Sequence, residues 1–335
     1  MIWLQFVICA LLVVVVGSLL SRYADILAEK TGLGRSWVGA VLLAGATSLP
    51  ELTTGISAVA IVNDVNLAAG GILGSCLFNL LLLGMLDVAS GSTPLLRRAE
   101  PSHILSAGFG CVMLLLVTLG LYVTATFSPL VLGWIGLPTL LILLVYAVSV
   151  RMISFFEKRR VQEVLAQEAV VYQYATIPLW RAVLSFILLA ASIAVLGLWL
   201  AMIGETITAV TGLGTSFVGA IFLAITTSLP EIVASFAALR LNAVDLAVSN
   251  IFGSNIFNIA ALAIYDFFYL PGDLWAQIAP IHSFTAIVAA LMTALAIIGL
   301  VYRAEKKPRW LVGWESFLLM VLYLGSMYVV YRVTL

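Results

Sequence analysis

Apolar residues run along the chain in long unbroken blocks, separated by short segments that hold most of the charged residues. Each block approaches or exceeds the roughly 20 apolar residues that a helix needs to cross a bilayer. There are ten blocks: 2–20, 36–62, 66–88, 103–124, 127–149, 180–203, 216–239, 245–268, 281–302 and 312–333. The pattern therefore predicts an all-α polytopic membrane protein with ten transmembrane helices and the lipid bilayer as its surroundings.

Composition narrows the possible functions. Of 335 residues, 63% are hydrophobic, and 16 basic residues balance 16 acidic ones, so a nucleic-acid partner is excluded. The cysteines Cys9, Cys76 and Cys111 lie inside apolar blocks without a C-x-x-C spacing, which excludes a disulfide framework and a thiolate metal site. Nothing in the sequence indicates a cofactor or an obligate protein partner.

The basic residues predict the orientation. If the N-terminus lies outside, 15 of the 16 Lys and Arg residues face inward and only Arg332 faces outward. The positive-inside rule therefore predicts that both termini lie outside. The first block follows Met1 without a basic segment or a cleavage site, so we expect it to be retained as a helix. This orientation, with a short central loop, fits a prokaryotic inner membrane.

An internal repeat divides the chain. Thr31-Gly-Leu-Gly-Arg-Ser-Trp-Val-Gly-Ala40 matches Thr211-Gly-Leu-Gly-Thr-Ser-Phe-Val-Gly-Ala220 at an offset of 180 residues, which becomes 179 further along. We assign residues 1–149 to a first five-helix repeat, 150–179 to a cytoplasmic linker with a short surface helix, and 180–335 to a second repeat. Because five is odd, the second copy enters from the opposite side, and such inverted repeats are typical of secondary transporters.

The second helix of each repeat contains a proline. Pro50 has no N–H for the carbonyl of Ala46, and Pro230 has none for the carbonyl of Thr226. We therefore expect each helix to open for about a turn. Carbonyl oxygens freed in this way are tolerated in a bilayer only where protein, water or an ion satisfies them.

A glutamate follows each proline. Glu51 and Glu231 each lie 15 residues after the serine that opens the segment, roughly 22 Å along a helix and deep in the bilayer. A carboxylate there is costly and by default functional. The alternative is a protonated or hydrogen-bonded glutamate that only stabilises the bundle.

Other oxygen-bearing side chains share helix faces with these acids or with one another. Ser75 and Asn79 are four residues apart, as are Ser254 and Asn258. Carboxylate, hydroxyl, amide and carbonyl oxygens together form a set that Na⁺ and Ca²⁺ prefer, whereas transition metals favour His or Cys. We interpret the nearby glycines as sites of close helix packing: Gly70, Gly71, Gly74 and Gly253.

The segments Gly39 to Asn79 and Gly219 to Asn258 resemble the α-repeats of the calcium/cation antiporter superfamily, in its sodium/calcium exchanger branch of prokaryotic type. The resemblance implies Na⁺-driven Ca²⁺ exchange by alternating access, with the long first helix of each half tilted outside a compact core. It places the ion ligands on the carboxylates of Glu51 and Glu231, the side chains of Thr47, Ser48, Thr227 and Ser228, the carbonyls of Ala44 and Ala224, and the side chains of Ser75, Asn79, Ser254 and Asn258.

The chain departs from the family pattern at several places near this site. Gly71 and Cys76 stand where asparagines are usual, and Ala46 and Thr226 stand where a glycine is expected. Asn258 stands where some exchangers have Asp, so only two acids remain in the core. Two acids favour two monovalent ions per Ca²⁺. We expect the acids Asp25 and Glu205, which match in the two copies, at solvated helix ends, and His103 at the membrane interface.

Other functions remain as alternatives. H⁺/Ca²⁺ exchange, or exchange of another divalent cation, would use the same two glutamates as proton carriers. A cation channel is less favoured, because two inverted proline-broken motifs suit a gate on each side. An intramembrane enzyme is not expected, because the chain has no G-x-G-D, H-E-x-x-H or Ser/Lys constellation.

Overall fold

The computed structural model describes residues 2–127, 131–167, 173–174, 176–211, 225–307 and 312–334, which are mostly helical. Within these residues eight helices are long and apolar enough to cross a membrane. They are α1 (Ile2–Thr31), α5 (Val65–Ala89), α7 (His103–Thr126), α8 (Leu137–Gln167), α9 (Leu179–Val210), α12 (Val244–Phe268), α14 (Ile281–Tyr302) and α15 (Trp314–Thr334). The architecture is that of a multi-pass integral membrane protein.

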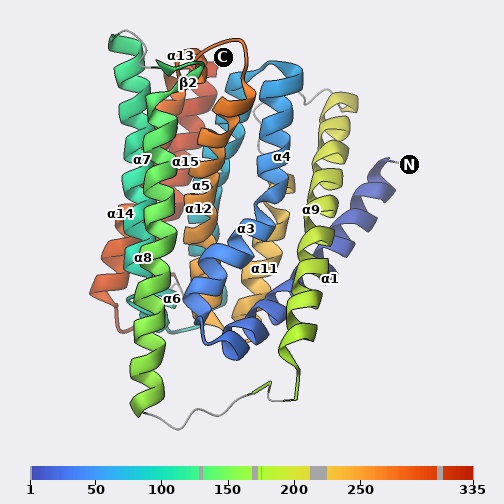
Figure 1. Ribbon diagram of the computed structural model, residues 1–335, viewed down its shortest axis with the longest axis vertical. Coiled ribbons are helices and arrows are strands. Elements are labelled where there is room, and N and C mark those ends of the chain that lie inside the picture. Colours follow the sequence, from blue (N-terminus) through green and yellow to red (C-terminus); the bar gives the residue numbers. More distant parts are fainter. Residues whose placement is uncertain are drawn as a thin grey trace.

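Residues 35–62 cross the bundle as a chain of short helical pieces. These are α2 (Arg35–Trp37), the π-helix η1 (Val38–Leu43), α3 (Ala44–Thr47), α4 (Leu49–Ser57) and the π-helix η2 (Ala58–Val62). Figure 1 shows this segment rising through the middle of the bundle. The matching segment is described from residue 225 onward and contains α11 (Leu229–Arg240). Two further short helices, α6 (Leu95–Arg98) and α13 (Leu274–Gln277), and the antiparallel pair β1 (Val131–Leu132) and β2 (Ile135–Gly136) lie between the long helices.

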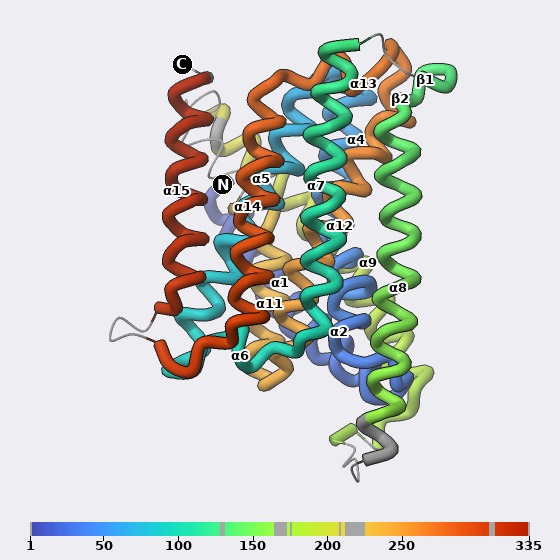
Figure 2. The backbone as a smooth tube through the Cα atoms, turned by 90° about the vertical axis from the view of Figure 1, so that its left-hand side faces the viewer, coloured from blue at the N-terminus to red at the C-terminus, as the bar shows by residue number. Residues whose placement is uncertain are grey.

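The long helices pack in pairs that join the two halves of the chain. α1 packs along α9, α5 against α12, and α7 against α14. The pair α1 and α9 lies at one side of the bundle, with α1 strongly tilted (Figure 1). Viewed from the other side, α7, α8, α14 and α15 stand in front of this pair (Figure 2). Among the described spans α12 is the most deeply buried, so the core is centred on it.

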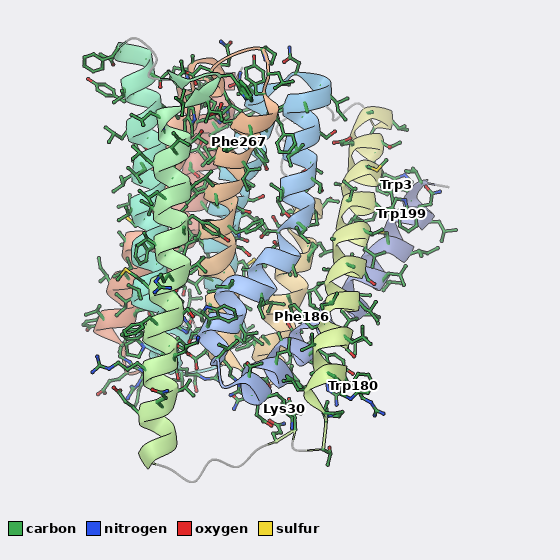
Figure 3. The ribbon with its side chains drawn as sticks, viewed as in Figure 1. Trp3, Lys30, Trp180, Phe186, Trp199 and Phe267 are labelled. Carbon is green, nitrogen blue, oxygen red and sulfur yellow. The ribbon has the colours of Figure 1, made fainter. Side chains whose placement is uncertain are left out.

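The outside of the α1 and α9 pair is apolar between two aromatic levels. Trp3 and Trp199 lie toward the upper end of the molecule, and Trp180 lies with Lys30 toward the lower end (Figure 3). Between these levels the exposed side chains include leucines of both helices. Because tryptophan collects where the bilayer meets water, the two levels indicate the two membrane interfaces.

Two buried aspartates fasten the halves together at opposite ends of the bundle. Asp87, near the end of α5, accepts hydrogen bonds from the backbone N–H of Leu95 at 2.7 Å and of Gly313 at 3.0 Å. Asp266, near the end of α12, accepts them from Leu274 at 3.3 Å and Gly136 at 2.8 Å. The two aspartates are 179 residues apart, so the same contact occurs twice. In each half, the carboxylate holds the start of the last long helix of the other half.

The connection between the halves is helical over residues 150–167, and this helix is the continuation of a transmembrane helix. α8 is a single helix that continues to Gln167, and its C-terminal end reaches the lower edge of the bundle in Figure 2. Residues 150–167 contain no glycine or proline, so nothing in the backbone stops the helix where it leaves the membrane.

Candidate ion-binding site

The central crossing segment is interrupted at one residue. Ser48, between α3 and α4, has φ −92° and ψ 7°, and Pro50 follows in the first turn of α4. Ser228 has nearly the same angles, φ −87° and ψ 9°, with Pro230 in the first turn of α11. The sequence therefore predicts the position of both breaks correctly.

The helix opens over a shorter stretch than the full turn that Pro50 predicts. The N–H of Ser48 still donates to the carbonyl of Ala44 at 3.0 Å, and the N–H of Leu52 donates to the carbonyl of Ser48 at 3.1 Å. The Ala44 carbonyl also accepts the hydroxyl of Thr47 at 3.3 Å. A carbonyl oxygen has two lone pairs, so an ion bound by Ala44 would have to replace one of these bonds.

The two breaks place the glutamates in one buried cluster. Glu51 is 5% exposed and Glu231 is 1% exposed. The hydroxyl of Ser48 donates to Glu231 Oε1 at 2.8 Å, and the hydroxyl of Ser228 donates to Glu51 Oε1 at 3.4 Å. Each serine therefore donates a hydrogen bond to the glutamate of the other repeat, and these bonds hold the two motifs together.

The neighbouring helices add the remaining predicted residues. The hydroxyl of Ser228 also lies 3.4 Å from that of Ser75 on α5. Asn79 on α5 and Ser254 and Asn258 on α12 are all buried. Thr227 is partly exposed. Ala224 lies outside the described residues.

Five buried oxygens of the predicted ligands have no hydrogen-bond partner in the described part of the chain: Glu51 Oε2, Glu231 Oε2, Asn79 Oδ1, Asn258 Oδ1 and Ser254 Oγ. An unpaired buried oxygen costs about 1–3 kcal/mol, so several from one predicted set need a physical explanation. A hard cation that takes oxygen ligands would satisfy them. The described residues contain no group of three or more His, Cys, Asp or Glu that could hold a metal ion. Ligation here would therefore depend on hydroxyl and amide oxygens as well as the two carboxylates.

Two further residues beside the site were not predicted. Tyr265 of α12 donates its hydroxyl to the main-chain carbonyl of Glu51 at 2.8 Å, and its ring fills the space that a side chain at Gly55 would need. Leu86 is the matching residue of the first repeat, so the repeat gives no signal for this tyrosine. Asn255 accepts the amide of Asn79 at 3.0 Å. It belongs to the second G-S-N motif, which could have identified it.

The glycine interpretation is confirmed where the central segment meets α12. A Cβ on Gly253 would lie 2.3 Å from the carbonyl oxygen of Ala40, so only glycine permits this approach. A Cβ on Gly70 would lie 3.1 Å from the ring of His282. At Gly71 and Gly74 a Cβ would meet nothing within 4 Å in the described part of the chain, so these two glycines are not explained by close packing there.

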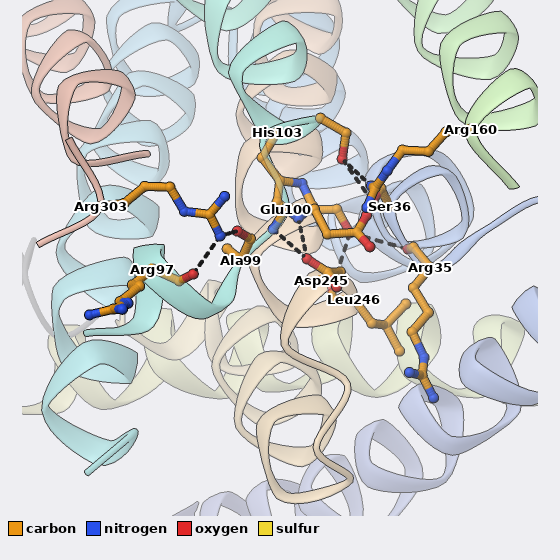
Figure 4. A network of polar contacts seen from close by, with 12 residues as sticks. Arg35, Ser36, Arg97, Ala99, Glu100, His103, Arg160, Asp245, Leu246 and Arg303 are labelled. Carbon is orange, nitrogen blue, oxygen red and sulfur yellow. Dashed lines mark hydrogen bonds and ion pairs between the residues drawn. The ribbon is translucent and has the colours of Figure 1, made fainter. Parts of the chain in front are cut away.

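A polar network lies at the lower end of the bundle. Asp245, at the start of α12, accepts the N–H of Glu100 at 2.8 Å and lies 3.0 Å from Nε2 of His103. Glu100 in turn pairs with Arg160 of α8 (Figure 4). His103 is therefore fully buried at its helix end and held by an acid.

The expectation of a solvated helix end is wrong for Asp25. This residue is 1% exposed and forms an ion pair with Arg35 at 2.5 Å. The hydroxyl of Tyr174 donates to Asp25 Oδ2 at 3.0 Å. Burial first, and then the Asp25 carboxylate, raise the pKa of Tyr174, which keeps its hydroxyl a donor. Glu205 is exposed, as expected.

Paired helices around a core of broken segments, with a buried oxygen cluster at the breaks, define a membrane transporter for cations. The sequence pattern of the family described as sodium/calcium exchanger protein matches residues 1–153 and 181–332. The chain belongs to this family, which confirms the resemblance of its two motifs to those of the calcium/cation antiporter superfamily.

Individual proteins are also similar to this chain. The chain is 28% identical over 312 residues to the protein of Alkalimonas amylolytica named "Putative antiporter CaxA", and the match covers 92% of each chain. The sodium-calcium exchanger NCX_Mj soaked with 10 mM Na⁺ and zero Ca²⁺ has a similar structure, with a TM-score of 0.69 and 20% identity over 98% of this chain and 99% of that chain. For NCX_Mj soaked with 100 mM Na⁺ and 10 mM Sr²⁺ the TM-score is 0.70 at 20% identity, with the same coverage. These structures show that the fold is shared.

Proposed function

We propose that this protein is a secondary-active antiporter that exchanges Na⁺ for Ca²⁺ at the buried cluster around Glu51 and Glu231. The observation that carries the proposal is the exchange of partners at the breaks, where Ser48 contacts Glu231 and Ser228 contacts Glu51. Its membership of the sodium/calcium exchanger protein family supports the same class of activity.

Charge explains how such a site would couple two ions. The two carboxylates carry −2 when ionised, which one Ca²⁺ or two Na⁺ neutralise equally. Because the same oxygens would hold either ion, Ca²⁺ and Na⁺ exclude each other. The protein would switch the site from one side of the membrane to the other only when the bound ions balance the charge of the carboxylates. Mutual exclusion of this kind produces exchange rather than flow of both ions in one direction.

The proposed topology has ten crossings in two inverted five-helix repeats, residues 1–149 and 180–335, joined by a linker over 150–179. Eight long helices, the segment 35–62 and α11 supply the described crossings. In Figure 1 the end of α1, α6, the end of α8 and the start of α9 all lie at the lower end. These elements carry the basic residues Lys30, Arg97, Arg98, Arg160 and Arg181. We assign this end to the cytoplasm, with both termini outside, in a prokaryotic inner membrane.

The second candidate is H⁺/Ca²⁺ exchange, or exchange of another divalent cation against protons. It is favoured by the same two carboxylates, because each can be neutralised by a proton in place of Na⁺. The first candidate requires a Na⁺ gradient, whereas the second requires a pH gradient. They can therefore be separated without changing the protein.

The test is Ca²⁺ uptake into proteoliposomes that contain the purified protein. One set of vesicles has an outward Na⁺ gradient at clamped pH, and the other has a pH gradient without Na⁺. Uptake only in the first set supports Na⁺/Ca²⁺ exchange, and uptake only in the second supports the proton-driven alternative. Uptake without any counter-ion gradient would indicate a channel and overturn both proposals. Empty vesicles serve as the control.

A further inference from the structure

The side chain of Asn255 forms two hydrogen bonds that link α12 to α5. Its Nδ2 donates to the backbone carbonyl of Cys76 at 3.2 Å, and its Oδ1 accepts Nδ2 of Asn79 at 3.0 Å. A carbonyl can only accept, so the Asn255 group that faces Cys76 must be its NH₂. The oxygen of Asn255 therefore faces Asn79, and the Asn79 group that meets it must be the donor.

This chain of bonds fixes the direction of the Asn79 oxygen. Because the NH₂ of Asn79 is turned toward Asn255, its Oδ1 points to the other side, where it is buried and has no hydrogen-bond partner among the described residues. Asn79 is one of the proposed ion ligands, and an amide binds a cation only through its oxygen. Asn255 thus holds this ligand in the orientation that an ion needs.

The second repeat contains the same arrangement with one residue changed. Asn258 matches Asn79 and Cys76 matches Asn255, both at an offset of 179 residues. The side chain of Asn258 accordingly lies against Cys76, but a thiol is only a weak donor and a weak acceptor. Among the residues that the structure describes, Asn258 Oδ1 is also buried without a partner. Within the same residues, the amide of Asn258 therefore lacks the strong anchor that Asn79 has.

The backbone is already placed for a symmetric pair. The Cys76 sulfur lies 4.0 Å from the carbonyl oxygen of Asn255, just as the Asn255 amide faces the carbonyl of Cys76. An asparagine side chain at position 76 would extend one bond further than the thiol of cysteine. It would direct its NH₂ toward the Asn255 carbonyl and its oxygen toward Asn258.

We propose that Asn255 is a positioning residue for the ion ligand Asn79, and that Cys76 leaves the matching ligand Asn258 less firmly oriented. The inference rests on the proposed function, because it takes both asparagines as ligands. It assigns the residue pair 76 and 255 as a determinant of ion affinity, outside the set of residues that would touch the ion.

The test measures binding of ⁴⁵Ca²⁺ to purified protein in Na⁺-free buffer, together with the rate of Ca²⁺ uptake at saturating Ca²⁺. A neutral hydrogen bond changes affinity by about three- to tenfold. Asn255→Ala should weaken Ca²⁺ binding by about this factor while the saturated rate stays within about twofold. Cys76→Asn should strengthen binding by about threefold or more. Cys76→Ala is the matched control, because it removes the thiol without supplying an amide, and it should leave affinity unchanged.

The two variants separate positioning from simple damage. Asn255→Ala could lose affinity by weakening the packing of α5 on α12, but a gain of affinity in Cys76→Asn cannot arise from damage. If Cys76→Asn binds Ca²⁺ no more tightly than Cys76→Ala, the positioning proposal is overturned. If the unchanged protein binds no Ca²⁺ at all, the proposed function itself fails.

Discussion

Ser48 and Glu231 are 183 residues apart in the chain and are joined by a 2.8 Å hydrogen bond inside the membrane core. The bond crosses between the two repeats, and the weaker contact of Ser228 with Glu51, at 3.4 Å, runs in the opposite direction. Neither repeat alone therefore completes the surroundings of its own glutamate. The side chains proposed to bind the ion therefore also hold the two repeats in contact.

Neutralising either glutamate should abolish exchange. Glu51→Gln or Glu231→Gln removes half of the charge that compensates Ca²⁺, and a contact pair is worth about 4 kcal/mol at an effective dielectric of about 20. We expect Ca²⁺ uptake in proteoliposomes to fall by about a thousandfold at a fixed low Ca²⁺ concentration. The control is Glu163→Gln, an exposed acid paired with Arg159 on the surface of α8. Uptake close to normal in either site variant would remove that glutamate from the site.

The two serines should differ in importance. Ser48 donates to Glu231 at 2.8 Å, and a hydrogen bond to a charged group contributes about 1.5–3 kcal/mol. Ser48→Ala should therefore raise the Ca²⁺ concentration for half-maximal uptake by about tenfold or more. Ser228→Ala should raise it less, because its 3.4 Å contact is at the limit of hydrogen bonding. Ser18→Ala, whose hydroxyl bonds only to its own exposed helix, serves as the control. Equal effects at Ser48 and Ser228 would contradict this ranking.

Close packing of the central segment on α12 gives a stability prediction. In Gly253→Ala the new methyl group would lie 2.3 Å from the Ala40 carbonyl oxygen, and this backbone atom cannot move without shifting η1. We expect the free energy of unfolding to fall by about 3 kcal/mol. The melting temperature in detergent, measured by tryptophan fluorescence, should fall with it. Gly108→Ala on α7 is the matched control, because its methyl group would meet nothing within 4 Å among the residues that the structure describes. A melting temperature equal to that of the control would show that the helices tolerate a wider separation.

Transport should depend only weakly on membrane potential. The two core carboxylates balance one Ca²⁺ or two Na⁺, and Asp25 adds no net charge because it is paired with Arg35. A cycle with three Na⁺ would move one charge, worth about 2.3 kcal/mol per 100 mV. Ca²⁺ uptake at equal ion gradients should therefore change by less than about twofold when valinomycin sets a potential of about −100 mV. A change of about fortyfold would instead require a third charge in the site.

The sequence predicted the features that follow from single residues and from the repeat. Pro50 and Pro230 located both breaks, and the offset between the copies paired Glu51 with Glu231. Contacts across the bundle had no such signal. Tyr265 bonds to the backbone of Glu51, and nothing in the pattern of either residue indicates that they meet. The burial of Asp25 was missed for the same reason, because its partner Tyr174 lies in a connection that the hydrophobic pattern leaves unplaced.

The boundaries of elements were also harder to predict than their presence. α8 was expected to stop near residue 149, where hydrophobicity ends, but it continues to Gln167. Hydrophobicity reports where a helix leaves the membrane, whereas helix propensity decides where it ends. The two π-helical stretches, η1 and η2, lie in apolar sequence that would suit a regular α-helix equally well.

Asp87 and Asp266 have a consequence for how the protein can be divided. Each carboxylate holds the start of the last long helix of the opposite half, so a half produced alone would keep an unsatisfied buried charge and lose the anchor of its own final helix. Two separate polypeptides, one ending after α8 and the other beginning before α9, should therefore be unstable singly yet assemble into a working protein when made together. The halves should therefore behave as complementary fragments, and the chain that connects them both keeps them in equal amounts and supplies Tyr174 to the buried Asp25.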